Sequence, residues 1–173
     1  AEIEGMMGSL LKVLVVEDLE FDGWQVVHQL EKAGYDVVSE RVETAGEMQA
    51  ALERQTWDLV ISDYTMPQFD APAALRLLQG TGLDIPFIVV SGTIGEETAV
   101  AMMKAGMHDY LMKGNLARLA PSVERELAQA EIRRDRRQTE QTLRESEQRY
   151  RSLFDNMLEG FAHCKMLIVQ TCI

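Results

Sequence analysis

Five polar side chains in this 173-residue chain are well placed to do chemistry, because each stands at the end of a short apolar run. Glu17 and Asp18 follow the first run, Asp63 follows a later one, Ser91 ends another and Lys113 follows the last. Three carboxylates in one partly desolvated pocket would repel one another, and a divalent cation would remove that repulsion. Ligation by oxygen atoms alone indicates Mg²⁺.

The same side chains suit the transfer of a phosphoryl group onto a carboxylate. Lys113 can place a positive charge on a phosphoryl oxygen, and Ser91 can donate a hydroxyl hydrogen to it. Asp63 would attack in line and become an acyl phosphate, and it needs no general base because a carboxylate is already deprotonated. Any one of these residues alone could simply cap a helix or close a turn. The functional interpretation therefore depends on the coincidence of all five.

These side chains can meet only if the chain alternates strands with helices around a parallel sheet. Five short runs rich in apolar residues predict the strands, and helical patterns lie between them. The predicted strands are Lys12–Val16, Tyr35–Val42, Leu59–Ser62, Pro86–Ser91 and Asp109–Met112. Ligands of such sheets bind beyond the carboxyl ends of the strands. The sequence predicts an α/β fold, a doubly wound five-stranded parallel sheet with a long C-terminal helix.

The helices between the strands have recognisable ends. The first is predicted over Phe21–Ala33 and is ended by Gly34, a residue that suits a helix C-terminus. Thr44 can cap the second helix, and Pro72 fits the first turn of the third. Glu96–Ala105 predicts the fourth helix, and Pro121 opens the last. The apolar stripe predicted for the first helix contains Phe21, Trp24, Val27, His28 and Leu30.

Composition excludes some classes of protein. Hydrophobic residues make up 46% and charged residues 26% of the chain, which is typical of a globular protein rather than a disordered one. The net charge of −11 argues against non-specific nucleic-acid binding. No run of about 18 apolar residues predicts a membrane span, and no signal peptide is visible. Cys164 and Cys172 fit no zinc or redox spacing, so we expect unpaired thiols in a cytoplasmic protein.

Four segments together resemble the response regulator receiver domain of two-component signalling. The matching segments are Val13–Asp18, Asp58–Pro67, Ile88–Gly92 and Asp109–Lys113. The resemblance covers Leu11 to Gln129 and implies a flavodoxin-like sheet of the receiver type. It also implies a phosphorelay in which a histidine kinase or a phosphotransfer protein is the partner.

The resemblance assigns roles to individual residues. Glu17, Asp18, Asp63 and the backbone carbonyl of Thr65 would hold Mg²⁺, Asp63 would accept the phosphoryl group, and Lys113 would pair with it. Glu17 stands where aspartate is commoner in the family, and the family tolerates this change.

Further roles implied by the resemblance concern the switch and the lifetime of the acyl phosphate. Ser91 and Tyr110 would move together when the phosphoryl group arrives, and Thr65 and Thr93 would tune how long it persists. Gly114 stands where the family usually has proline, so we expect a trans peptide bond after Lys113.

The remainder of the chain follows the receiver-like part. We expect an N-terminal extension over 1–10, a receiver domain over 11–129, a helical linker over 130–150 and the truncated start of a PAS-like domain over 151–173. The charges of alternating sign from Glu131 to Arg151 favour a solvated helix with i,i+4 pairs. A lone exposed helix and a parallel coiled coil in a homodimer both stay open for this segment. Glu145–Gly160 resembles the opening of a PAS sensory domain, which would be the downstream output module.

Three other functions compete with the receiver interpretation. Haloacid dehalogenase-like phosphatases also use an aspartate nucleophile with Mg²⁺, but they need a second acid where this chain has Thr65. A DNA-binding regulator would need a helix-turn-helix after the receiver-like part, and the sequence shows none. The parent protein could be a sensor histidine kinase or a cyclic-dinucleotide cyclase, so whether it is an enzyme stays open.

Overall fold

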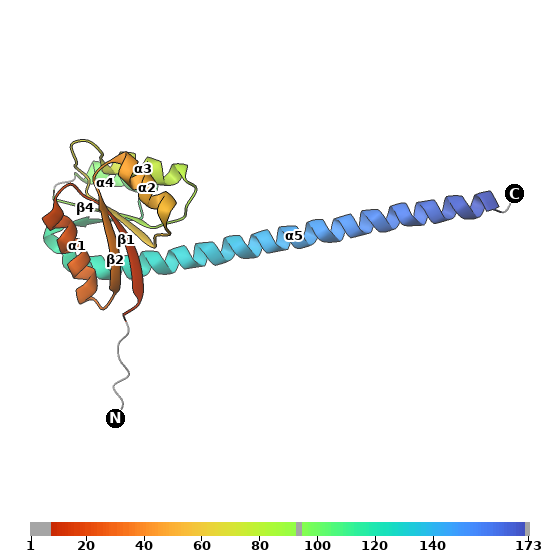
Figure 1. The fold of residues 1–173 in the computed structure, drawn as a ribbon, viewed down its shortest axis with the longest axis horizontal. Helices are drawn as coiled ribbons and strands as arrows, with labels where there is room; N and C mark the ends of the chain where they lie inside the picture. Colours follow the sequence, from red (N-terminus) through yellow and green to blue (C-terminus); the bar gives the residue numbers. More distant parts are fainter. Residues whose placement is uncertain (1–7, 93–94, 172–173) are drawn as a thin grey trace, which may run out of the picture. The chain divides into compact units, whose positions relative to one another are not determined.

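The computed structural model describes residues 8–92 and 95–171, with the side chains of the last helix described as far as 157 except at 155. Five parallel strands form one sheet in the order β2-β1-β3-β4-β5 (Figure 1). The strands are β1 (Leu10–Val16), β2 (Asp36–Val42), β3 (Leu59–Ser62), β4 (Phe87–Ser91) and β5 (Asp109–Met112). The predicted five-stranded, doubly wound parallel sheet is confirmed.

Helices alternate with these strands along the chain. They are α1 (Glu20–Lys32), α2 (Ala45–Arg54), α3 (Ala71–Gly80), α4 (Glu96–Ala105), a short 3₁₀ helix η1 (Lys113–Arg118) and α5 (Leu119–Thr171). Thr44 caps α2, as predicted, and it does so in a reciprocal capping box with Glu47. Gly106 closes α4 in the left-handed conformation at φ 111°, which glycine adopts without strain.

The sheet separates two apolar layers. On one face, Val26 and Leu30 of α1 and Leu119 and Val123 of α5 pack against alternate residues of the strands. On the other face, the layer includes residues of α2 and α3, together with Met102 of α4. The inner strands β1, β3 and β4 are buried on both faces, which explains why their sequences are continuous apolar runs rather than alternating ones.

The apolar stripe of α1 is only partly buried. Gly23, Val26 and Leu30 face the sheet, whereas Phe21 is 64% exposed and Trp24 is 56% exposed. A Cβ atom on Gly23 would lie 3.1 Å from Cδ of Arg41, so α1 approaches the sheet through its glycine. Phe21 and Trp24 therefore lie on the exposed side of α1, although they share the helical spacing of its apolar residues.

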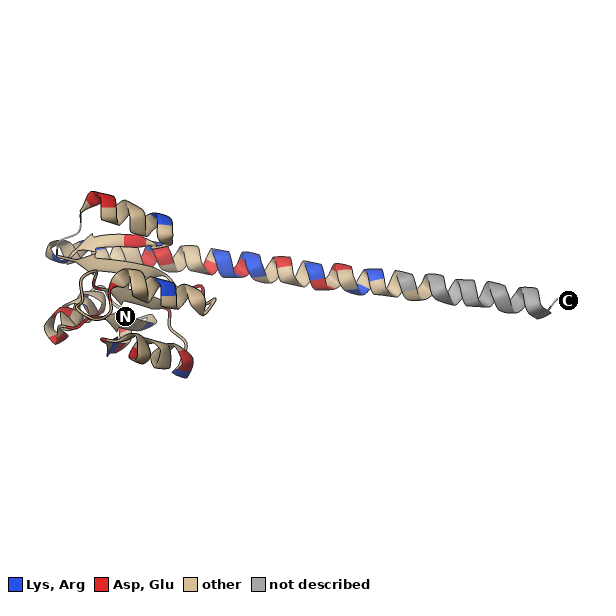
Figure 2. Ribbon diagram, turned by 90° about the horizontal axis from the view of Figure 1, so that it is seen from above, with Lys and Arg blue, Asp and Glu red and all other residues tan. Residues whose placement is uncertain are grey.

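By its internal contacts the chain consists of two units, residues 1–131 and 132–173. In the second unit the described residues form a helix whose basic and acidic side chains alternate (Figure 2). Arg136 and Glu140 form one of the expected i,i+4 ion pairs at 2.9 Å. Among the described residues, no helix is both long enough and apolar enough to cross a membrane. No peptide bond of the described residues is cis, so the expectation for Lys113–Gly114 is confirmed.

Candidate functional site

The strand register brings the candidate residues to one edge of the sheet. Val16 of β1 pairs with Ser62 of β3, so Glu17 and Asp63 both lie one step beyond paired residues. Ser91 of β4 pairs with Met112 of β5, which places Lys113 immediately beyond that pair. The chain positions that carry chemistry are therefore aligned by backbone pairing before any side-chain contact is considered.

Three carboxylates form a cluster at this edge. Glu17, Asp18 and Asp63 each offer an oxygen, and these oxygens all lie within 4.8 Å of one another. Glu17 is 3% exposed and the Asp63 side chain is 10% exposed, so the cluster is partly shielded from water. A set of hard oxygen donors at this separation fits a cation such as Mg²⁺, which prefers carboxylate ligands and water.

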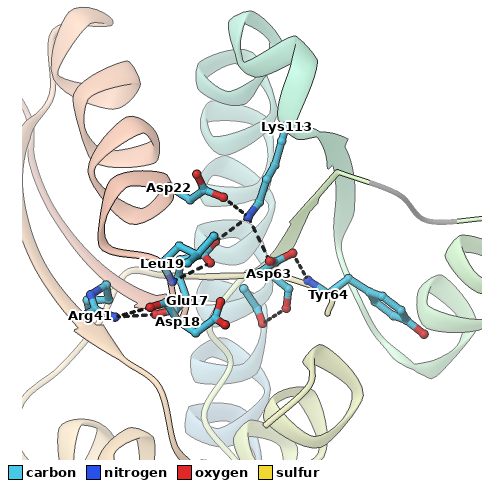
Figure 3. Close-up of polar contacts among 9 residues, drawn as sticks. Glu17, Asp18, Leu19, Asp22, Arg41, Asp63, Tyr64 and Lys113 are labelled. Atoms are coloured by element: carbon cyan, nitrogen blue, oxygen red, sulfur yellow. Dashed lines mark hydrogen bonds and ion pairs between the residues drawn. The ribbon is translucent and has the colours of Figure 1, made fainter. Parts of the chain in front are cut away.

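Lys113 is the cation of this cluster. Its Nζ donates to Glu17 Oε2 at 2.9 Å, to Asp63 Oδ2 at 3.0 Å and to Asp22 Oδ2 at 2.5 Å (Figure 3). Burial opposes the charge of the ammonium group, but the three carboxylates outweigh burial and raise the pKa of Lys113 above its ordinary value. Lys113 therefore remains protonated across the physiological pH range.

Glu17 responds to the same surroundings in the opposite way. Burial raises the pKa of its carboxyl group, while the hydrogen bonds from Lys113 and from the backbone N–H of Leu19 only partly counter this effect. The neighbouring charge of Asp63 raises the pKa further. Ionisation of Glu17 is therefore unfavourable in free energy even beside Lys113, and a bound metal ion would make it more favourable.

Asp63 is held in a fixed orientation at the end of β3. One carboxylate oxygen, Oδ1, accepts a hydrogen bond from the backbone N–H of Tyr64 at 2.6 Å, and Oδ2 accepts one from Lys113. The backbone N–H of Asp63 itself donates to the carbonyl of Val16 at 2.8 Å. The carboxylate is therefore tied to the sheet on one side and faces Lys113 with its other oxygen.

Two residues that the sequence did not single out take part in this arrangement. Asp22, in the first turn of α1, accepts a hydrogen bond from Lys113. Arg41, at the end of β2, donates from Nη1 to the carbonyl oxygens of Glu17 at 2.9 Å and Asp18 at 3.3 Å. Asp22 could have been suspected, since it is an acid in the first turn of the helix that follows Asp18. Nothing in the sequence pattern indicates that Arg41 reaches the loop after β1.

The remaining predicted residues are placed as follows. Ser91 is buried at the last position of β4, and Tyr110 is half-buried in β5 with its hydroxyl donating to the sulfur of Met112. Thr65 is exposed in the loop two residues after Asp63. Thr93 lies outside the described residues.

Comparisons with known proteins agree with this geometry. Residues 13–124 match the family model described as response regulator receiver domain. The transcriptional regulatory protein ZraR of Salmonella typhimurium is 29% identical over 133 residues, which cover 71% of this chain and 28% of ZraR. The chemotaxis protein CheY of Bacillus subtilis is 26% identical over 102 residues, covering 59% of this chain and 84% of CheY.

A solved structure extends the comparison to a third kind of parent protein. The signal receiver domain of a signal transduction histidine kinase from Syntrophus aciditrophicus is 32% identical, with a TM-score of 0.58 over 68% of this chain and 89% of that one. The chain spans less than a third of ZraR, so the match covers one module of a larger protein in that case. Similar modules thus occur in a transcriptional regulator, a chemotaxis protein and a kinase. With the family model covering most of the chain, and with the sheet order and acidic cluster described above, the chain belongs to the response regulator receiver domain family of two-component signalling.

Proposed function

We propose that Asp63 accepts a phosphoryl group from a histidine kinase or a phosphotransfer protein in a Mg²⁺-dependent reaction. The observation that carries this proposal is the position of Lys113, whose ammonium group lies 3.0 Å from the Asp63 carboxylate within a cluster of acids. A carboxylate that faces a half-buried cation at the rim of a parallel sheet has both a nucleophilic oxygen and a partner for the incoming phosphoryl oxygens.

The transfer makes one bond and breaks one. A carboxylate oxygen of Asp63 attacks the phosphorus of a phosphohistidine, the new P–O bond forms as the P–N bond breaks, and the electron pair of that bond returns to the imidazole nitrogen. Lys113 donates to a phosphoryl oxygen, and the Tyr64 N–H keeps the carboxylate plane fixed during the attack. Hydrolysis of the acyl phosphate by water later restores the Asp63 carboxylate.

Glu17, Asp18, Asp63 and the backbone carbonyl of Thr65 are the proposed ligands of Mg²⁺. When bound, the ion would neutralise the acidic cluster and the charge on the phosphoryl oxygens. The close grouping of the three carboxylates and the raised pKa of Glu17 support this choice of ligands.

Ser91 and Tyr110 are the proposed switch residues. Ser91 ends the strand next to β5, and Tyr110 lies in β5 three residues before Lys113, so both adjoin the place where new negative charge would arrive. Phosphorylation adds about −1.5 to −2 charges there and would favour the arrangement in which Ser91 and Lys113 contact the phosphoryl oxygens. Thr65 and Thr93 are proposed to tune the lifetime of the acyl phosphate.

The output of the switch is proposed to be a PAS-type module that begins near 151, after the linker helix. In the second unit, Leu143, Tyr150 and Met157 are exposed at seven-residue intervals, and Leu153 lies three residues after Tyr150. This spacing supports a homodimer through α5, with a second copy of the same helix as the partner. Phosphorylation of Asp63 would then change how the α5 helices of the two copies associate.

The proposed location of the protein is the cytoplasm, because the phosphoryl groups of histidine kinases derive from ATP. Nucleic acid is not among the proposed partners, since the net charge is −11 and the arginines of α5 alternate with acids. The membrane is not among them either.

The direct test is incubation with Mg²⁺ and acetyl phosphate, followed by measurement of the intact mass. Wild type should gain the mass of one phosphoryl group, and neither Asp63→Asn nor wild type in EDTA should do so. A gain that persists in Asp63→Asn would place the phosphoryl group elsewhere. Size-exclusion chromatography with light scattering on the same samples tests the homodimer, with Leu143→Lys as the variant expected to stay monomeric and Arg144→Lys as its control.

A further inference from the structure

Asp22 is an acidic residue of the site that is outside the proposed metal cluster. It lies in the first turn of α1, and its side chain is 23% exposed. Its Oδ2 accepts from Lys113 Nζ at 2.5 Å, a shorter contact than those of Glu17 and Asp63 with the same nitrogen. Figure 3 shows Asp22 and Asp63 on different sides of the ammonium group.

The hydrogen-bonding capacity of Lys113 is fully used. An ammonium group has three hydrogens to donate, and here they go to three carboxylates from three different elements, at the end of β1, in α1 and after β3. Lysine side chains have four rotatable carbon–carbon bonds and lose substantial conformational entropy when fixed. The direction of the ammonium group is therefore set by its acceptors.

Two of these three acceptors have another task under the proposed function. Glu17 and Asp63 would offer oxygens to Mg²⁺, and Asp63 becomes an acyl phosphate when it is phosphorylated. Asp22 has neither task, so its bond to Lys113 is the one that can persist through metal binding, phosphoryl transfer and hydrolysis. We infer that Asp22 is a positioning residue, which keeps Lys113 directed at the phosphoryl group throughout phosphorylation and hydrolysis. This inference rests on the proposed function.

A different role for Asp22 would give the opposite result. Four carboxylates and one ammonium group leave the site with a formal charge of 1 − 4 = −3. If Asp22 merely added to this charge, its removal would weaken repulsion of an anionic phosphodonor and speed phosphorylation. If Asp22 positions Lys113, its removal slows phosphorylation although the site becomes less negative.

The test compares Asp22→Ala with Glu20→Gln, Lys113→Ala and the double variant Asp22→Ala/Lys113→Ala. Glu20 lies in the same helical turn and is exposed, so its variant controls for the loss of one charge. The phosphorylation rate by acetyl phosphate is measured against Mg²⁺ concentration. We expect Asp22→Ala to lower the maximal rate about ten-fold, as loss of a charge-assisted hydrogen bond would, while the half-saturating Mg²⁺ concentration changes less than about two-fold. Glu20→Gln should change neither.

The double variant tests whether Asp22 acts through Lys113. In the Lys113→Ala background, the Asp22→Ala change should have no further effect on the rate, because the group that it positions is gone. Equal slowing in both backgrounds would overturn the inference, as would faster phosphorylation of Asp22→Ala.

An NMR measurement separates failure of this inference from failure of the proposed function. The ¹⁵N-resolved ammonium signal of Lys113 should be protected from solvent exchange in wild type and in Glu20→Gln, and lost in Asp22→Ala. If wild type takes up no phosphoryl group, the proposed function fails, and the ammonium signal alone then decides whether Asp22 holds Lys113. Unchanged protection in Asp22→Ala would overturn the inference even where phosphorylation of Asp63 is normal.

Discussion

Arg41 Nη1 donates a hydrogen bond to the backbone carbonyl of Glu17 at 2.9 Å, which ties the end of β2 to the loop that carries two proposed metal ligands. The same nitrogen reaches the carbonyl of Asp18 at 3.3 Å and pairs with the carboxylate of Glu43. Glu43 balances the positive charge of Arg41, so the main effect of Arg41 on the loop is to satisfy two backbone carbonyls and fix their direction.

Replacing Arg41 by alanine should weaken Mg²⁺ binding about five-fold and lower the free energy of unfolding by about 1 kcal/mol, because the loop of Glu17 and Asp18 loses its hydrogen bonds. Isothermal titration calorimetry and urea denaturation measure the two effects. Arg54→Ala is the control, since Arg54 makes an exposed ion pair with Glu40 away from the loop. Tighter Mg²⁺ binding in Arg41→Ala would mean that repulsion by the guanidinium outweighs its structural role.

Mg²⁺ itself should stabilise the folded domain through the acidic cluster. At one hundred times its dissociation constant, a ligand of the folded state alone adds about 2.7 kcal/mol to the free energy of unfolding. Asp18→Asn should remove most of this gain, because it deletes one of the three clustered carboxylates. Asp70→Asn is the matched control, since Asp70 caps α3 outside the cluster and asparagine also caps helices. Thermal unfolding with and without Mg²⁺ measures the difference, and equal gains in both variants would contradict the proposed ligands.

The sequence predicted the parts of this molecule that depend on strong local patterns. Apolar runs located the five strands, and the parallel topology then required Asp63 and Lys113 to meet although they are 50 residues apart. Contacts that depend on side-chain reach were not predictable in the same way. Arg41 can reach the loop of Glu17 because α1 has a glycine, Gly23, where the aliphatic part of the arginine side chain passes. The spacing of apolar residues within α1 or within β2 does not reveal this contact between the two elements.

The pH dependence of stability should reveal the network around Asp109. Burial of Asp109 raises the pKa of its carboxyl group, but hydrogen bonds from Ser122, from the Tyr110 N–H and from Arg125 outweigh burial and leave the pKa below its ordinary value. A lowered folded-state pKa contributes stability that is present above the unfolded-state value of about 3.9 and is lost as the pH falls through the folded-state value.

The free energy of unfolding of Asp109→Asn should therefore be lower than that of wild type by on the order of 1 kcal/mol near pH 7. This difference between the two proteins should become smaller below about pH 4. Glu17, whose raised pKa works in the opposite sense, is present in both proteins and cancels in the comparison. Urea denaturation near pH 7 and below about pH 4 measures the difference in the free energy of unfolding between the two proteins. If this difference were the same at both pH values, Asp109 would contribute through packing rather than through its charge.

The two tryptophans provide a test of the orientation of α1. Trp57 is 3% exposed and its Nε1–H donates to the carbonyl of Ala51 at 2.9 Å, so Trp57→Ala should lower the free energy of unfolding by about 3–5 kcal/mol. Trp24 is 56% exposed and only stacks on its helical neighbours Phe21 and His28, so Trp24→Ala should cost less than about 1 kcal/mol. Denaturant titrations followed by circular dichroism compare the two variants. Similar costs would mean that Trp24 packs into the core in solution and that Gly23 does not face the sheet.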